Sequence, residues 1–173
     1  MCKTGGQHTF AGSMNYVLCL DGEPRQQANI GQDQWRHCRS CELLCYDGKT
    51  SCAAGGPHVS VGSSNYVITA PMNTPTPGAQ TGWRWCNKCY GLAYSANPSD
   101  GTCPRGGTHA FGGSAIYNIL ANQATRPGYQ DKWSWCKHCQ QLWYSGNNAA
   151  RCCFSPLGYH TAEGSMNYSL KMR

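Results

Sequence analysis

WRWCNKCYGLAY, residues 83–94, is one of three related stretches in this chain of 173 residues. Its counterparts are WRHCRSCELLCY at 35–46 and WSWCKHCQQLWY at 133–144. The Cys-x-x-Cys pairs therefore recur at intervals of 86 − 38 = 48 and 136 − 86 = 50 residues. Self-similarity at such a period is the mark of a repeat architecture, so each stretch is read as the same part of a repeated unit.

Each stretch is followed by a second shared element, in which a Cys and a His precede a Gly-Ser turn. The three versions are CAAGGPH then GSSNY (52–58, 62–66), CPRGGTH then GSAIY (103–109, 113–117), and CFSPLGYH then GSMNY (153–160, 164–168). The N-terminus has this second element alone, as CKTGGQH at 2–8 and GSMNY at 12–16. We therefore expect a half repeat at 1–30 and full repeats at 31–80, 81–130 and 131–173, packed as one structural unit.

Three Cys and one His per full repeat predict a closed, tetrahedral zinc site rather than a disulfide scaffold. Three Cys cannot all pair with one another within a repeat, and a disulfide scaffold would not require a His at the same position in every repeat. Structural zinc is held by four thiolate or imidazole ligands, often with two in a Cys-x-x-Cys turn. A unit of ~50 residues also buries too little apolar surface to fold without such a metal or a disulfide. The predicted ligands are Cys38, Cys41, Cys52 and His58; Cys86, Cys89, Cys103 and His109; and Cys136, Cys139, Cys153 and His160.

Two features of the ligand pattern have more than one interpretation. In the third repeat Cys152 and Cys153 are adjacent, and we favour Cys153 because its spacing to His160 is closer to that in the other repeats. The half repeat offers only Cys2 and His8. This pair is vestigial in our first interpretation; otherwise it recruits Cys19 or Cys45, or meets its counterpart across a homodimer. A fourth zinc site there is therefore doubtful.

The alternation of residues predicts an all-β fold. Trp-x-Trp before the Cys pair and Leu-x-Tyr after it alternate like two half-buried strands joined at the metal-binding turn. The segment from His through Gly-Ser to Tyr predicts a second hairpin, which makes about four short strands per repeat. Three such repeats are compatible with a closed, pseudo-threefold arrangement like a β-trefoil or with a quasi-linear array.

The pattern WxWCxxCxxLxY…CxxGGxH…GSxNYxL resembles a tandem zinc-binding repeat known from bacterial, notably actinobacterial, and fungal proteins. That repeat often occurs in tandem or beside hydrolase-type modules, and the resemblance covers nearly the whole chain. It implies a zinc-stabilised accessory or lectin-like binding module that recognises carbohydrates or surfaces. Two positions depart from the pattern: His37 replaces the Trp of the other copies, and Ile116 replaces their Asn.

Composition argues against catalysis and favours binding. The chain has only eight acidic residues, no carboxylate recurs in all copies, and four of its six His occupy the ligand position. No Ser-His-acid order or phosphate-binding loop occurs either. Glycan sites use aromatic faces and a few polar groups, and the repeats would provide several weak sites together. The candidate ligand-binding residues are Trp143, Asn65, Tyr66, Asn167 and Tyr168. Trp143 replaces Ala93 and Cys45 of the other copies, so we expect its ring to be exposed.

Nucleic acid is the alternative ligand class. The net charge is +6, and basic residues gather beside the Cys pairs. However, three thiolates, a neutral His and one Zn²⁺ sum to −1, so three sites would leave about +3. A toxin or defence protein that docks on a target surface is a third possibility. We expect no membrane span. The N-terminus MCKTGGQHTF has no secretion-signal pattern, which favours a cytosolic protein with non-classical release, or a signal removed before residue 1.

Overall fold

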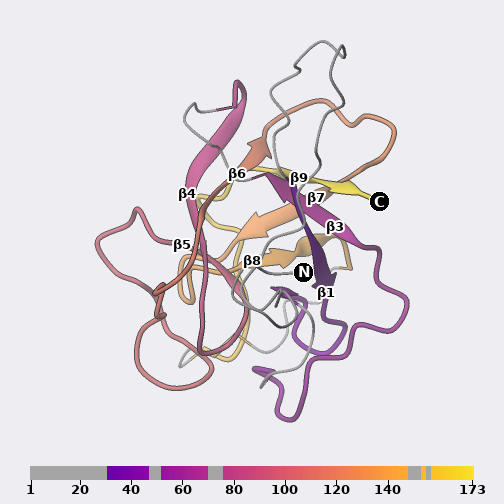
Figure 1. The fold of residues 1–173 in the computed structure, drawn as a ribbon. Coiled ribbons are helices and arrows are strands. Elements are labelled where there is room, and N and C mark those ends of the chain that lie inside the picture. Colours follow the sequence, from indigo (N-terminus) through magenta and orange to yellow (C-terminus); the bar gives the residue numbers. More distant parts are fainter. Residues whose placement is uncertain (1–30, 47–51, 70–75, 148–152, 155–156) are drawn as a thin grey trace, which may run out of the picture.

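The computed structural model describes residues 31–46, 52–69, 76–147, 153–154 and 157–173, and these form an all-β fold (Figure 1). Among the described residues there is no α-helix; one short 3₁₀ turn, η1, spans Ser145–Asn147. None of the described segments forms a helix long and apolar enough to cross a membrane. The strands are β1 (Gly31–His37), β2 (Leu44–Tyr46), β3 (Tyr66–Thr69), β4 (Ala79–Trp85), β5 (Leu92–Tyr94), β6 (Ile116–Ala121), β7 (Tyr129–Trp135), β8 (Leu142–Tyr144) and β9 (Tyr168–Met172).

Each repeat contributes three of these strands, joined in the same way. The long first strand pairs with the short second strand across the Cys-x-x-Cys turn, with Trp35 opposite Tyr46, Trp83 opposite Tyr94 and Trp133 opposite Tyr144. Its other edge pairs with the third strand of the same repeat, and a β-bulge interrupts that pairing in all three copies. β4 and β7 begin at Ala79 and Tyr129, slightly before the expected repeat boundaries.

The expectation of a fourth strand in each repeat is not met in the described residues. The segment from the His to the Gly-Ser turn is extended or turn-like without a strand in all three repeats. Its backbone is held by single contacts to the Cys-x-x-Cys turn, such as Arg39 N–H to Val59 O at 2.9 Å and Asn87 N–H to Ala110 O at 2.9 Å. The third strand therefore pairs with the first strand of the repeat rather than with this segment.

The three repeats close into a ring, which settles the choice between a closed and a linear arrangement. At one end β3, β6 and β9 pair with one another in all three combinations. At the other end short bridges join Cys45 to Gly91, Ala93 to Gln141 and Trp143 to Leu43, so that each repeat contacts the next and the third contacts the first. The result is a nearly closed, barrel-like sheet with pseudo-threefold symmetry.

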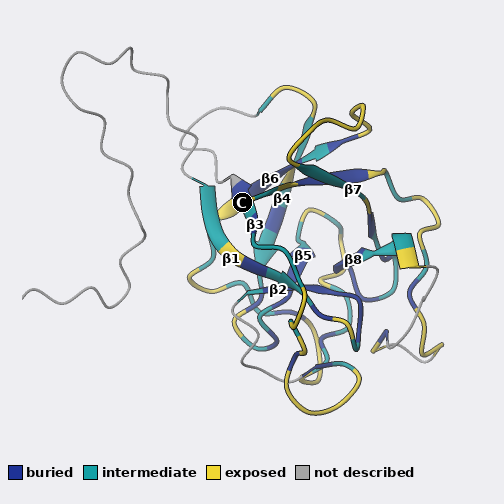
Figure 2. Ribbon diagram, turned by 90° about the vertical axis from the view of Figure 1, so that its right-hand side faces the viewer, coloured by how far each residue is buried: buried dark blue, intermediate teal, exposed yellow. Residues whose placement is uncertain are grey.

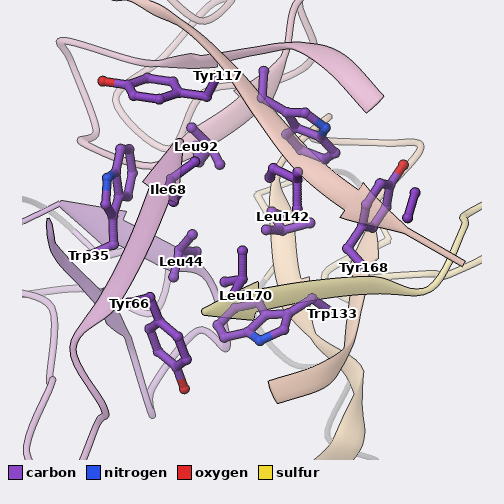
Figure 3. Packing of buried hydrophobic residues seen from close by; sticks show 13 residues of the cluster. Trp35, Leu44, Tyr66, Ile68, Leu92, Tyr117, Trp133, Leu142, Tyr168 and Leu170 are labelled. Carbon is purple, nitrogen blue, oxygen red and sulfur yellow. The ribbon is translucent and has the colours of Figure 1, made fainter. Parts of the chain in front are cut away.

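The core lies inside this ring and is built from equivalent residues of the three repeats. Trp35, Trp83 and Trp133 are fully buried. Each Trp meets a Tyr of another repeat edge to face, with ring centroids 5.2–5.6 Å apart, and such pairs add to the energy of burial. Figure 3 shows the labelled Trp and Tyr rings surrounding Leu44, Leu92 and Leu142. Buried and partly buried strands thus occupy the centre, and the most exposed segments are loops at the periphery (Figure 2).

Hydrogen bonds between repeats follow the same cycle. The hydroxyl of Tyr66 donates to Gln130 in the third repeat, and that of Tyr168 donates to Gln80 in the second at 2.6 Å. Tyr117 completes the set by donating to Gln32 of the first repeat. The buried phenols are therefore paired, and each pair fixes one repeat against another.

Candidate metal centres

The twelve predicted ligands form three clusters, one in each repeat. They are centre 1 (Cys38, Cys41, Cys52, His58), centre 2 (Cys86, Cys89, Cys103, His109) and centre 3 (Cys136, Cys139, Cys153, His160). Within each cluster all four candidate ligand atoms lie within 4.8 Å of one another, and every one of the twelve residues is buried. The first and second Cys come from the turn between two strands, and the third Cys and the His come from the following loop.

The distances within each cluster match the edges of a zinc tetrahedron. The Sγ atoms of the first and third Cys are 3.7, 4.0 and 3.8 Å apart in centres 1, 2 and 3. In all three centres the Sγ of the second Cys is 3.6 Å from Nδ1 of the His. Zn–S and Zn–N bonds of about 2.3 and 2.0 Å give tetrahedral edges of about 3.8 and 3.6 Å. A disulfide needs about 2.05 Å between its sulfurs, and none of the ten described cysteines forms one. The residues therefore fit zinc, and the prediction of three zinc sites is confirmed.

The surrounding backbone is arranged for thiolates. In centre 1 the amides of Ala54 and Val59 donate to Cys52 Sγ and Cys38 Sγ, each at 3.4 Å. In centre 2 the amides of Arg105 and Ala110 donate to Cys103 Sγ and Cys86 Sγ at the same distance. Such donors stabilise negative charge on the sulfurs and orient them, as outer-shell groups do in metal sites.

Ionisation of the thiols explains why these clusters need a cation. Hydrogen bonds from Cys103 and Cys89 lower the pKa of Cys86 far below its usual value. Hydrogen bonds with Cys103 and Cys86 raise the pKa of Cys89, and burial raises it further. Burial by itself lowers the pKa of His109, but hydrogen bonds with Cys103 and Cys86 outweigh it and raise that pKa to about 9. Without a metal only part of the cluster ionises, whereas a bound Zn²⁺ supplies the charge that allows all three thiolates to form.

The other ring nitrogen of each ligand His joins one repeat to the next. His58 Nε2 lies 3.4 Å from the carbonyl oxygen of Cys89, His109 Nε2 lies 2.9 Å from that of Cys139, and His160 Nε2 lies 3.0 Å from that of Cys41. A hydrogen bond from Nε2–H to a carbonyl fixes the tautomer in which Nδ1 is free to bind metal. Every centre thus holds its own repeat together and also positions the turn of the neighbouring centre.

One position beside the centres differs in every repeat. Leu43, Gly91 and Gln141 are equivalent, and each bridges the short second strand of the preceding repeat in the ring, at Trp143, Cys45 and Ala93. Gln141 is 1% exposed, and its Nε2 donates to Cys89 Sγ at 3.5 Å. A Cβ atom on Gly91 would lie 1.9 Å from that same amide nitrogen, so Gly91 makes the space that Gln141 uses. Sequence reasoning missed the contact between Gln141 and Cys89, because the two residues are 52 positions apart.

The structure also decides the ambiguous ligands, as far as the described residues allow. Cys153 rather than its neighbour belongs to centre 3. Cys45 is buried beside centre 1, its thiol donates to Arg36 O at 3.4 Å, and burial raises its pKa, so it is not among the four clustered ligands. Cys2, His8 and Cys19 lie outside the described residues, and a fourth site is not supported.

The expectation that Trp143 is exposed is wrong. Only 4% of Trp143 is accessible, and its ring stacks on His160 with centroids 5.3 Å apart and an angle of 18°. The physical reason is its position in the ring: Trp143 fills the interface between the third and first repeats, opposite Leu43. Tyr66 and Tyr168 are likewise 3% and 2% exposed, so the faces of these three rings are not at the surface.

The other two candidate ligand-binding residues have a structural task. Asn65 Oδ1 accepts a hydrogen bond from the amide of Gln34 at 2.8 Å, and Asn167 Oδ1 accepts one from the amide of Lys132 at 2.8 Å. Both donors are bulge residues with positive φ, 70° and 63°. The second repeat has Gly82 at the bulge, φ 98°, where no Asn is available because Ile116 replaces it. The departure at Ile116 is therefore paired with a glycine that adopts this conformation without strain.

The Gly-Ser turn is structural as well. In each repeat the Ser hydroxyl accepts a hydrogen bond at 2.8 Å from the residue just before the Cys-x-x-Cys turn. These hydroxyls belong to Ser63, Ser114 and Ser165. Each also donates to the backbone carbonyl of the residue that follows it.

Comparison with family models, with curated proteins and with solved structures gave no match. The structure by itself supports a tandem metal-binding repeat, with three Cys-x-x-Cys…Cys…His clusters in equivalent places.

Proposed function

We propose that this protein is a non-catalytic binding module that recognises glycans, in which zinc holds a recognition loop between two metal ligands. The loop that joins Cys153 to His160 carries the proposal. Its described residues Phe154, Leu157 and Tyr159 are 45%, 52% and 49% exposed. Exposed apolar side chains carried by one loop are candidates for an interaction site.

The third repeat differs from the other two at this loop. The equivalent loops contain the glycine pairs Gly55-Gly56 and Gly106-Gly107, which place no side chain at the surface. An aromatic ring on a loop fixed at both ends meets the requirement for stacking on a sugar, since little conformational freedom is lost on binding. The recognition surface proposed here therefore replaces the buried rings that sequence reasoning favoured.

The absence of catalysis is supported by how four of the five described His side chains are used. In each ligand His, Nδ1 faces the thiols and Nε2 contacts a carbonyl of the next repeat. A zinc ion with three thiolates and one imidazole has no open position for a substrate water. His37 contacts Glu42 at 2.7 Å and is enclosed by the rings of Trp133 and Tyr144.

Charge favours glycans over nucleic acid. Two of the basic residues beside the Cys-x-x-Cys turns are engaged within their own repeats: Lys88 donates to the carbonyl of Thr108 at 2.9 Å, and Lys137 pairs with Glu163. Lys88 is thus held by a backbone carbonyl and Lys137 by a carboxylate of its own repeat, which leaves both less available to a phosphate. Zinc binding would further reduce the formal +6 to about +3.

The test is a glycan array with zinc-loaded protein and two loop variants. We expect selective glycan binding that Tyr159→Ala abolishes while the zinc content stays at three per chain. Val61→Ala is the matched control, because Val61 is 75% exposed on a loop of the first repeat. Binding of DNA or RNA with a steep salt dependence, together with silence on the array, would contradict the proposal.

A further inference from the structure

A cavity of about 210 Å³ lies where the third strands of all three repeats meet. Its wall includes Val67 and Ile68 of β3, Asn118 of β6 and Ser169 of β9. Because β3, β6 and β9 pair with one another, this cavity lies on the pseudo-threefold axis. It is separate from the metal centres and from the loop of residues 153–160.

Two polar side chains in this cavity have no obvious structural purpose. Asn118 and Ser169 are 5% and 6% exposed, and within the described part of the chain neither Asn118 Oδ1 nor Ser169 Oγ has a hydrogen-bond partner. The amide nitrogen of Asn118 makes a long contact, from Nδ2 to Thr76 Oγ1 at 3.4 Å. An unpaired buried polar atom destabilises a fold, so a purely structural position would favour an apolar side chain.

The first repeat shows that an apolar residue suits this position. Val67, Asn118 and Ser169 are equivalent, since each directly follows the core Tyr of its repeat. With Val67 the same strand pairing forms without an unpaired polar atom. Asn118 and Ser169 are therefore not required by the backbone.

The mouth of the cavity is positively charged. Arg126 and Lys171 line it, and none of the described residues in its wall is acidic. The Arg126 guanidinium lies over the ring of Tyr129, 4.0 Å from the centroid, which positions this charge beside the cavity. A ligand would thus meet two cations at the entrance and, within, one amide and one hydroxyl.

We propose that this axial cavity binds a small carboxylate that also carries hydroxyl groups, of the hexuronate class. The carboxylate would pair with Arg126 and Lys171, and ring hydroxyls would exchange hydrogen bonds with Asn118 and Ser169. Both side chains can donate and accept, as a hydroxylated ligand requires. The volume is below the range of about 300–1,000 Å³ typical of drug-sized ligands, so it suits a single sugar ring.

The experiment is calorimetric titration of the zinc-loaded protein with D-glucuronate, with D-glucose and acetate as matched probes. We expect glucuronate to bind, and glucose and acetate to bind at least tenfold more weakly. Arg126→Gln should weaken glucuronate binding about tenfold, the effect of losing one charge-assisted hydrogen bond. Arg105→Gln removes the same charge from an exposed loop outside the cavity and should leave binding unchanged.

A second variant uses the residue of the first repeat. Asn118→Val combined with Ser169→Val should abolish glucuronate binding and raise Tm by about 2–4 °C, since two unpaired polar groups leave the interior. Tyr159→Ala should bind glucuronate normally, so failure of the loop proposal and failure of this one are distinguishable. Equal heats for glucuronate and acetate, no heat for glucuronate, or unchanged binding by the double Val variant would show that solvent alone fills the cavity and would overturn the proposal.

Discussion

The interface between the third and first repeats is packed differently from the two interfaces between consecutive repeats. At the closing interface Trp143 lies opposite Leu43, and both side chains are buried. Around this pair centres 1 and 3 form one continuous buried cluster. Centre 2 forms a cluster of its own, with Phe111 against it.

The backbone contacts at the three interfaces are nevertheless equivalent. Tyr46 N–H donates to Tyr90 O, Tyr94 N–H to Gln140 O and Tyr144 N–H to Glu42 O, each at 2.8 Å. The side chains at the consecutive interfaces are smaller or polar, with Cys45 opposite Gly91 and Ala93 opposite Gln141. Symmetry of the main chain therefore does not require symmetry of the packing.

The difference follows from chain connectivity. Consecutive repeats are joined by short loops, whereas the first and third repeats meet only after the whole chain between them has been ordered. Closing that longer loop costs more conformational entropy. A Trp–Leu contact removes the most apolar surface from water where this cost is greatest, which stabilises the ring at its closure.

The largest expected effect comes from removing one metal ligand in each kind of cluster. We expect Cys86→Ser to release the zinc of centre 2 and leave two ions per chain, because its buried cluster is separate and meets centre 3 through the His109 contact to Cys139 O. Cys136→Ser should release the zinc of centre 3 and also weaken centre 1, which shares its cluster. Each structural zinc contributes on the order of 10 kcal/mol of apparent binding free energy in such units.

The measurement is the zinc-to-protein ratio by mass spectrometry, with near-ultraviolet circular dichroism of the same samples. Removal of all zinc with a chelator is the reference for complete loss. Equal zinc-to-protein ratios for the two Ser variants would show that zinc binding at centres 1 and 3 is not coupled. An unchanged melting curve for Cys86→Ser would exclude a structural role for centre 2.

The next largest effect concerns the closing contact. Trp143→Ala should lower the free energy of unfolding by about 3–5 kcal/mol, the usual range for a buried Trp. Cys45→Ala, which introduces the residue of the second repeat at the equivalent position, should cost only about 1 kcal/mol. Chemical denaturation of zinc-loaded protein measures both, and similar values would mean that the interfaces are equivalent.

Alkaline pH should act on all three interfaces through the core tyrosines. Burial raises the pKa of Tyr66 to about 12, and it raises that of Tyr117 to about 12 as well, against about 10 in an unfolded chain. Because the folded pKa is the higher one, this contribution to stability is complete below pH 10 and is lost as pH rises from 10 to 12. Absorbance at 295 nm should show these phenols ionising only as the near-ultraviolet dichroism is lost. Early ionisation within an intact fold would contradict their burial.

A smaller effect is expected at Gln141. Replacing it with Leu removes the donor to Cys89 Sγ, which should weaken zinc at centre 2 about tenfold and leave the other two ions unchanged. Competition with a chromophoric chelator measures the zinc affinities, and we expect one of the three ions to be bound more weakly than the other two. Gln123→Leu, on an exposed loop, is the control, and an equal effect there would remove the basis for the outer-shell role.

The smallest effect tests the bulge that distinguishes the second repeat. Asn65→Ile should cost about 1 kcal/mol, because the Gln34 amide loses its acceptor while its φ stays positive. Adding Gln34→Gly reproduces the combination of Gly82 with Ile116 and should restore part of the loss. Thermal melts of the two variants measure this effect. If the double variant recovers no stability, the glycine at the bulge does not compensate for the loss of the Asn.

Much of the fold and of the metal centres was predictable from the sequence. The repeat of Cys-x-x-Cys with a distant Cys and His predicts the ligands, because zinc demands four donors and a tight turn supplies two of them. Alternating Trp and Tyr around the Cys pair predict the strands β1, β2 and their equivalents. These signals lie within a single repeat, so they do not depend on how the repeats are arranged in space.

The exposure of aromatic residues was not predictable in the same way. Trp143 replaces Ala93 and Cys45, which suggests a surface position, yet it is buried because the ring closes there. Asn65 and Asn167 look like polar groups at a hairpin tip. Their side-chain Oδ1 atoms instead accept hydrogen bonds from bulge amides on the neighbouring strand. Both outcomes depend on residues far away in the chain.

The sequence by itself determined that the chain is all-β, that it repeats, and which residues bind metal, since those properties follow from spacing and residue chemistry within one repeat. Only the tertiary structure decided that the repeats close into a ring and that each ligand His holds the turn of the next repeat. It also decided which aromatics are left outside and placed two unpaired polar groups on the axis. The physical reason is that contacts between repeats depend on relative orientation, which three equivalent local patterns leave open.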